Sequence, residues 1–200
     1  ELAVARGFRQ ADGSPVLVCG STWPADEAVI AEALSTTDAG LRVIIAPHEP
    51  SEASSVAIAS AFPAPVVRWG DAMDADARTL IVDHIGSLAR LYKYADTVYV
   101  GGGFGDGTHS VLEAAAWGKP VIFGPRHRKF PEVRGLMQAG AGSEVADARG
   151  LARVLHEHIV DPAKRARAGD AAARYVRERT GATDLEQAFL KLIAVPETIG

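Results

Sequence analysis

The chain has 200 residues, of which 48% are hydrophobic, and this is enough for one domain with a sizeable core. Its formal net charge of −4 argues against general nucleic-acid binding, and no apolar run approaches membrane-spanning length. The single cysteine, Cys19, excludes a disulfide framework within the chain and is typical of a reducing compartment. No signal peptide is recognisable, and the chain begins with Glu1 rather than Met, so it is either processed or a piece of a longer protein.

The first part of the chain alternates apolar runs with segments of helical composition. Residues 1–9 are either a short helix or the end of a linker. Apolar runs predict strands at 16–19, 41–46, 66–69 and 79–82. Helices are expected at 25–34, 52–62 and 88–94.

A strand, a glycine-rich loop, a helix and a second strand follow between residues 95 and 125. The two strands are predicted at 97–100 and 121–123, the helix is predicted at 109–117, and five glycines lie between residues 101 and 107. Beyond this unit the sequence predicts a helix at 131–139, a short last strand at 143–145, and helices at 148–159, 162–179 and 183–193.

Continuous apolar strands that alternate with helices are typical of a parallel sheet covered on both faces. The sequence therefore predicts a single α/β domain with a Rossmann-like sheet. The loops at the carboxyl ends of parallel strands converge on one edge, where ligands bind in such folds. This edge would carry His48, His109, Glu113 and the basic residues of 126–129, a set that suits a ligand with both a phosphate and a sugar.

The glycine loop leaves two interpretations open. Glycines permit close approach of a ligand, and a loop that leads into a helix start exposes N–H groups suited to phosphate. Glycine-rich turns after strands also serve tight packing alone. The loop lacks the G-K-[ST] of a P-loop and the last glycine of a dinucleotide fingerprint. On a helix that starts at residue 109, His109 and Glu113 would face the same side of the first turn.

Several motifs together resemble one known family. They are Val100-Gly101-Gly102-Gly103-Phe104, His109-Ser110-Val111-Leu112-Glu113-Ala114 and Gly118-Lys119-Pro120-Val121-Ile122-Phe123-Gly124-Pro125. These resemble the pattern G-G-S/T-F, G-G-H-N-x-L-E-P and G-x-P-V-I-x-G-P in the C-terminal, donor-binding half of 3-deoxy-D-manno-octulosonic acid (Kdo) transferases, which are GT-B glycosyltransferases. Three further elements are similar to family segments: Gly20-Ser21-Thr22, Pro47-His48, and Val82-Asp83 with Gly86-Ser87-Leu88. The resemblance covers about residues 16–140 well.

The resemblance implies a nucleotide-sugar-binding domain from which the N-terminal acceptor domain is absent. In this family the donor is CMP-Kdo, the acceptor is a lipid A precursor of lipopolysaccharide biosynthesis, and no metal or other cofactor takes part. The carboxylate base lies in the other domain, so this chain is expected to hold no catalytic residue and to be inactive alone. The whole enzyme is expected at the cytoplasmic face of the inner membrane, in peripheral contact with it, and this fragment is expected to be soluble.

The resemblance and the strand-end positions together assign substrate binding to a set of loop residues. These are Ser21, Thr22, Pro47, His48, Gly86, Ser87, Leu88, Gly102, Gly103, Phe104, His109, Ser110, Val111, Leu112, Glu113, Arg126 and Lys129. Glu113 either accepts hydrogen bonds from the ribose or is a charge favoured at a helix start. His109 either touches phosphate or has a structural role. Arg126 and Lys129 either neutralise an anion or belong to a solvated basic loop.

The sequence leaves open the roles of several residues and the choice between alternative functions. Ser21 and Thr22 either donate to the donor sugar or cap the following helix. Ser110 stands where the family usually has asparagine, Ala114 replaces a proline, and His48 lies at or beside the arginine position of Pro-Arg-His. The alternatives are another GT-B glycosyltransferase or a UDP-sugar epimerase, which nucleotide preference would distinguish, and a non-catalytic nucleotide-binding module.

Overall fold

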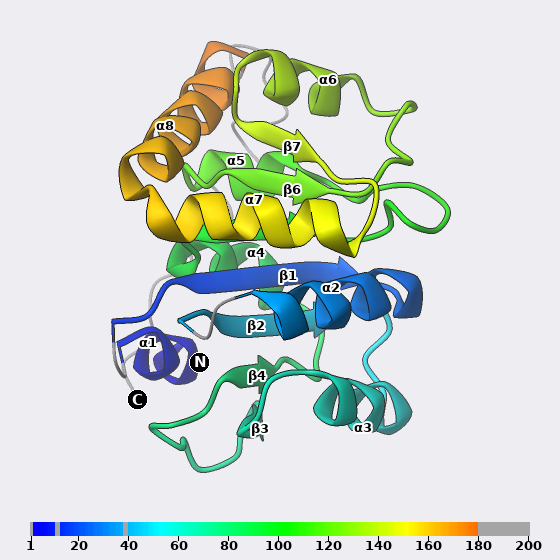
Figure 1. Cartoon of the computed structure of the whole chain (residues 1–200), viewed down its shortest axis with the longest axis vertical. Coiled ribbons are helices and arrows are strands. Elements are labelled where there is room, and N and C mark those ends of the chain that lie inside the picture. Colours follow the sequence, from blue (N-terminus) through cyan, green and yellow to red (C-terminus); the bar gives the residue numbers. More distant parts are fainter. Residues whose placement is uncertain (1, 11–12, 38–39, 180–200) are drawn as a thin grey trace.

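A seven-stranded parallel sheet runs through the middle of the molecule (Figure 1). Its strands lie in the order β3 (Val66–Arg68), β4 (Thr79–Ile81), β2 (Arg42–Pro47), β1 (Val16–Thr22), β5 (Thr97–Val100), β6 (Val121–Phe123) and β7 (Gly142–Glu144). This computed structural model describes residues 2–10, 13–37 and 40–179. The predicted parallel, Rossmann-like sheet is confirmed, and the helix expected at 183–193 lies outside the described residues.

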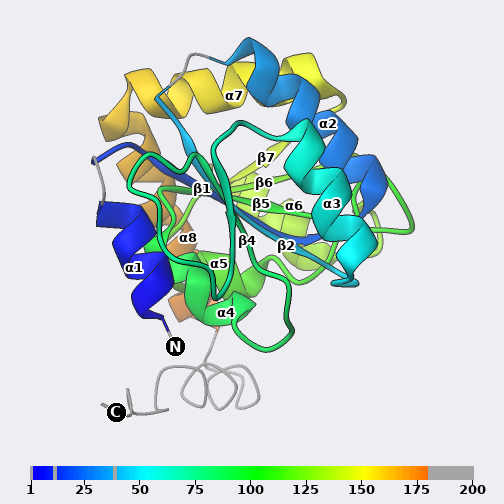
Figure 2. The ribbon, with the colours of Figure 1, turned by 90° about the horizontal axis from the view of Figure 1, so that it is seen from below.

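Helices cover both faces of the sheet (Figure 2). One face carries α2 (Pro24–Thr36), α3 (Glu52–Ala61) and α7 (Ala148–Val160). The other carries α1 (Ala3–Gln10), α4 (Leu88–Leu91), the 3-10 helix η1 (Tyr92–Tyr94), α5 (Leu112–Ala116), α6 (Pro131–Gln138) and α8 (Pro162–Arg179). The first segment is therefore a helix, and the segment predicted as one helix at 88–94 divides into α4 and η1.

The burial of β1 shows why its first four residues, 16–19, are a continuous apolar run. Successive side chains on a strand point to opposite faces. Val16 and Val18 enter the core beneath α1 and α8, whereas Leu17 and Cys19 enter the core beneath α2 and α7. All four side chains are fully buried, as expected for a strand between two helical layers.

The helix predicted at 109–117 is shorter than expected and begins at Leu112. The residues before it form hydrogen bonds that close the glycine loop. The His109 N–H donates to the Gly101 carbonyl at 3.0 Å, and the Thr108 N–H donates to the Arg126 carbonyl at 3.0 Å. The prediction that His109 and Glu113 share the first helical turn is therefore wrong, because long-range backbone pairing holds His109 outside the helix.

The sheet order reverses at β1. The chain passes from β1 to β2 on one side, and β5 pairs with β1 on the other side. Such a reversal leaves a crevice outside the carboxyl ends of the two strands, which is where ligands bind in open α/β sheets. The loops that follow β1 and β5 are therefore the strongest candidates for a functional site.

Candidate functional site

Three strand-end loops meet at this crevice and are joined by backbone hydrogen bonds. The Gly101 N–H after β5 donates to the Gly20 carbonyl of β1 at 2.9 Å, and the His48 N–H after β2 donates to the Thr22 carbonyl at 2.8 Å. The ends of β1, β2 and β5 are thus held side by side. The convergence that the sequence predicted for His48 and the glycine loop is confirmed.

A stack of three aromatic rings, Trp23, His48 and His109, lies where these loops meet. The Trp23 and His48 ring centroids are 4.6 Å apart, and those of His48 and His109 are 4.4 Å apart with only 15° between the ring planes. The Trp23 Nε1–H also donates to His109 Nε2 at 3.1 Å. An imidazole nitrogen accepts a hydrogen bond only when it is unprotonated, so neutral His109 carries its proton on Nδ1.

The electrostatics agree with a neutral His109. Burial lowers the pKa of this imidazole, the neighbouring His48 lowers it further, and Asp26 acts in the opposite direction. His48 itself is exposed at the mouth of the crevice. The site therefore offers an N–H donor from His109 at neutral pH.

Asp26 is the buried residue that ties the crevice together. It lies in the first turn of α2 and is fully buried. Its carboxylate accepts from the Gly102 N–H at 2.8 Å, the Tyr99 hydroxyl at 2.9 Å and the Trp23 N–H at 3.0 Å. The sequence analysis missed this residue. An acidic residue in a first helical turn is a recognisable signal for a helix cap, but its contact with a loop 76 residues away is not visible in the sequence.

The glycines of the β5 loop pack against other backbone. A Cβ on Gly101 would lie 2.2 Å from the Ser21 carbonyl oxygen, and a Cβ on Gly103 would lie 2.5 Å from the Gly124 nitrogen. Gly102 has a φ of +90°, which favours glycine, and its N–H is bound by Asp26. These glycines therefore allow close packing of the backbone. The Gly102 N–H is not available to a ligand, because it already donates to Asp26.

The β1 loop separates its two predicted polar residues. Thr22 is buried, and its Oγ1 donates to Glu27 Oε1 at 3.0 Å, while burial raises the pKa of Glu27. Ser21 is half-buried, has a left-handed φ of +52°, and makes no side-chain hydrogen bond within the part of the chain that the structure describes. Non-glycine residues in this conformation are uncommon and often occur at functional sites. Of the two hydroxyls, that of Ser21 is the one available to a ligand.

The α5 end of the crevice holds the predicted carboxylate. Glu113 lies in the first turn of α5 and is partly buried, and this burial raises its pKa. Its charge also raises the pKa of the buried Tyr92 phenol, so the two side chains are neighbours. Ser110 is exposed, whereas Val111 is fully buried in the core and Leu112 is only partly exposed.

The remaining predicted residues lie on the neighbouring loops. Ser87 is buried and its Oγ hydrogen-bonds His84 Nε2 at 2.7 Å, while Gly86 is exposed with a φ of +105°. Leu88 packs against Gly20, where an added Cβ would approach Leu88 Cδ1 to 2.8 Å. Pro47 is buried at the end of β2.

A basic hollow lies beside the glycine loop. It has a volume of about 430 Å³ and is lined by Asp106, Gly107, Pro125, Arg126, Arg128, Lys129 and Phe130. The Arg126 guanidinium donates to the Gly105 carbonyl at 2.6 Å, which fixes this loop over the glycines. Arg128 belongs to the basic residues of 126–129 that the sequence placed at this edge, whereas Phe130 is a lining residue that the sequence analysis did not name. The hollow can hold an anionic group.

Within the described ranges 2–10, 13–37 and 40–179, no group of three or more His, Cys, Asp or Glu side chains could hold a metal ion. None of the helices found there is long and apolar enough to cross a membrane.

Comparison with known proteins identifies relatives of the chain. No protein-family model matches it. A protein of Bordetella pertussis named 3-deoxy-D-manno-octulosonic acid transferase is 28% identical over 205 residues, covering 92% of this chain and 46% of that protein. A protein of the same name from Chlamydophila psittaci is 30% identical over 179 residues, covering 87% of this chain and 41% of that protein. The chain is a homologue of the Kdo transferases.

The match to these transferases is partial in length. The chain spans less than half the length of the curated relatives cited here. A solved structure of the same fold is the C-terminal CMP-Kdo binding domain of WaaA from Acinetobacter baumannii. It has a TM-score of 0.76 and 22% identity, and the match covers 88% of this chain and 100% of that domain. The predicted Rossmann-like fold, of the kind found in the C-terminal half of GT-B glycosyltransferases, is confirmed.

Proposed function

We propose that this chain is the donor-binding part of a Kdo transferase and that it binds the CMP moiety of CMP-Kdo in the crevice beyond β1 and β5. The observation that carries the proposal is the stack of Trp23, His48 and His109 where the loops after β1, β2 and β5 meet, in a homologue of Kdo transferases. Glu113 at the start of α5 and the basic hollow lie on segments that adjoin the glycine loop. A domain of the same fold bears the name CMP-Kdo binding domain.

The phosphate of the donor suits the side between His109 and the basic hollow. His109 offers an N–H, and Arg126 and Lys129 offer positive charge. Glu113 is placed to accept hydrogen bonds from the ribose hydroxyls, and the exposed residue Ser110 lies just before α5. The Ser21 hydroxyl is available to the sugar. The amide of Gly102 plays no direct part in this arrangement, because Asp26 holds it.

The chemistry required of this half is stabilisation of the leaving group. When the sugar is transferred, the bond between its anomeric carbon and the phosphate oxygen breaks, and negative charge develops on the departing CMP. Fixed N–H donors and cations aimed at that charge lower the barrier. We propose that His109, Arg126 and Lys129 do this without a metal cofactor.

We further propose that the other half of the enzyme completes the reaction. The acceptor would be a lipid A precursor held by the N-terminal half, which would also supply the carboxylate base and the contact with the cytoplasmic face of the inner membrane. Residues 1–200 alone should then show no transfer of Kdo from CMP-Kdo to a lipid A precursor. Measurable turnover by this chain would contradict this division of roles.

Nucleotide binding tests the proposal directly. Isothermal calorimetry of the chain with CMP, UMP and GMP should show saturable binding that is tightest for CMP. Preferential binding of UMP or GMP would favour another GT-B glycosyltransferase, and no binding of any nucleotide would overturn the proposal. Lys93→Gln, which changes one exposed charge outside the crevice, is the control variant. Gly103→Ala is unsuitable as a control, because the added Cβ would disturb the packing of the glycine loop.

A further inference from the structure

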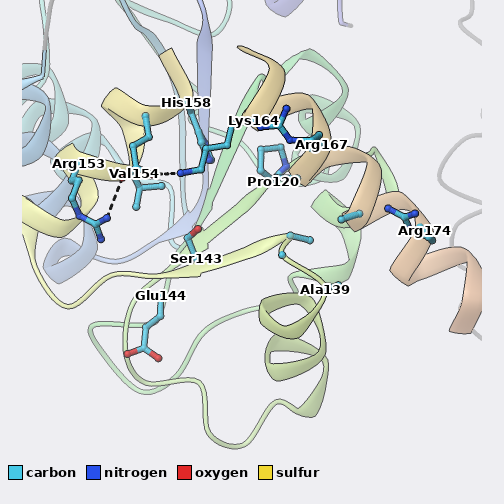
Figure 3. A pocket seen from close by; sticks show the side chains of 15 residues that line it. Pro120, Ala139, Ser143, Glu144, Arg153, Val154, His158, Lys164, Arg167 and Arg174 are labelled. Carbon is cyan, nitrogen blue, oxygen red and sulfur yellow. Dashed lines mark hydrogen bonds and ion pairs between the residues drawn. The ribbon is translucent and has the colours of Figure 1, made fainter. Parts of the chain in front are cut away.

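A second hollow lies along the open edge of the sheet, between α7 and α8 (Figure 3). It has a volume of about 510 Å³, and its floor includes Ser143 of the edge strand β7 and Ala141 just before it. Its lining shares no residue with the predicted donor site. We call this hollow the edge groove.

The two helices give the edge groove cationic walls. Residues 164, 167, 168, 171 and 174 of α8 all line the groove, a spacing that places them along one face of a helix. Ala168 and Ala171 are small and leave space between the charged side chains. The α7 wall contributes Arg153, and Figure 3 shows it across the opening from Arg167 and Arg174 of α8.

The carboxylates of the groove do not neutralise its outer arginines. Glu157 accepts from Arg153 at 3.1 Å and from Lys164 at 2.7 Å, and the other lining carboxylate, Glu144, contacts His127. Arg167 and Arg174 are both exposed, and neither has an ion pair or hydrogen bond with another described residue. An excess of positive charge therefore faces the groove, on a chain whose net charge is −4.

A buried histidine of α7 also lines the groove. His158 is 7% exposed, and its Nδ1 pairs with the Thr97 hydroxyl of β5 at 2.9 Å. Its Nε2 has no hydrogen-bond partner among residues 2–10, 13–37 and 40–179. Burial lowers the pKa of His158 to about 4; Arg165 and Lys164 of α8 act in the same direction, and Glu157 opposes them. The largest of these charge effects comes from Arg165, which donates to the His158 carbonyl and does not line the groove, whereas the lining residues Glu157 and Lys164 act in opposite directions.

From this juxtaposition we propose that the edge groove binds a phosphate group. A guanidinium group matches the geometry of phosphate oxygens, and the two outer arginines, Arg167 and Arg174, are not engaged elsewhere in the described chain. Addition of an extended peptide to β7 is disfavoured, because this edge strand is only three residues long. The phosphate could come from a soluble phosphorylated compound or from the headgroup of an acidic lipid.

The first test is a titration of the ¹⁵N-labelled chain with inorganic phosphate in the absence of nucleotide, because CMP itself carries a phosphate group that would compete for the edge groove. The amides of residues 141–144 and the imidazole of His158 should shift saturably, and the pKa of His158 should rise as the anion binds. The variant Arg167→Gln/Arg174→Gln should weaken this binding about ten-fold or more, the loss expected for a charge-assisted hydrogen bond. The variant Lys93→Gln/Arg134→Gln, which removes two exposed charges elsewhere, should bind phosphate as the unaltered chain does.

The second test separates the two sources of phosphate. Vesicles of phosphatidylglycerol should sediment the chain but not the Arg167→Gln/Arg174→Gln variant if the groove takes a lipid headgroup, with phosphatidylcholine vesicles as the control. Saturable phosphate binding without sedimentation would assign a soluble ligand. Absence of shifts in residues 141–144 and His158, or an equal loss of binding in both double variants, would overturn the proposal. These readouts do not depend on whether CMP binds in the other crevice.

Discussion

The Trp23→Phe variant tests the account of His109 at the level of one hydrogen bond. The indole Nε1–H lies 3.1 Å from His109 Nε2, and this bond exists only while that nitrogen is unprotonated. Phenylalanine keeps an aromatic ring beside His48 but removes the donor. The variant should therefore make His109 easier to protonate.

The size of this effect follows from the energy of the bond. A neutral hydrogen bond contributes about 0.5–1.5 kcal/mol to the state that contains it, and one pKa unit corresponds to 1.36 kcal/mol. Loss of the bond should raise the pKa of His109 by roughly 0.4–1.1 units. Burial is the largest cause of its lowered pKa and remains in the variant.

An NMR titration of the imidazole resonances measures this pKa in the free chain, and long-range ¹H–¹⁵N spectra report which nitrogen carries the proton. The matched control is Trp69→Phe, because Trp69 contacts a different histidine, His84, at 5.0 Å between ring centroids. An unchanged or lowered pKa of His109 in Trp23→Phe, or an equal rise in the control, would refute the reasoning.

Three other predictions concern binding, packing and pH. Glu113→Gln should weaken CMP binding by about ten-fold or more in calorimetry, because a charge-assisted hydrogen bond is lost, while the melting temperature changes little. Unchanged affinity would remove Glu113 from the site. Gly103→Ala should lower the free energy of unfolding by about 1–3 kcal/mol in urea titrations, because the new Cβ would lie 2.5 Å from the Gly124 nitrogen, whereas Gly105→Ala meets nothing closer than 3.7 Å and should be milder. Equal losses in the two variants would contradict the packing argument. His158 has a folded pKa of about 4, below its ordinary 6.5, so its contribution to stability is full above pH 6.5 and declines as the pH falls towards 4. The loss of unfolding free energy between pH 7 and 4.5 should be about 2–3 kcal/mol smaller in His158→Gln, and an equal loss would show that His158 is not the cause.

The sheet could be predicted from the sequence because its strands are buried on both faces. The runs 16–19 of β1 and 98–100 of β5 are apolar at every position, so neither the existence of these strands nor their parallel arrangement depended on contacts between distant residues. The loops at their carboxyl ends followed from the same topology. The residue list of the donor site came largely from the family resemblance, and its contacts with a nucleotide stay predictions.

The parts that the sequence did not reveal depend on contacts between distant residues. The start of α5 was misplaced because Thr108 and His109 bond to Arg126 and Gly101 instead of continuing a helix. The role of Asp26 was missed because its main partner, the Gly102 amide, lies on another loop. The ring stack joins three loops, and no local pattern around Trp23 indicates that its indole reaches His109.

The most direct test of the central claim is to map CMP on the ¹⁵N-labelled chain by amide chemical shifts. The account predicts saturable changes at residues 21–23, 48, 109–113 and 126–129, around the crevice beyond β1 and β5. Changes confined to residues outside these loops, or no change at CMP concentrations that saturate a Kdo transferase, would contradict it.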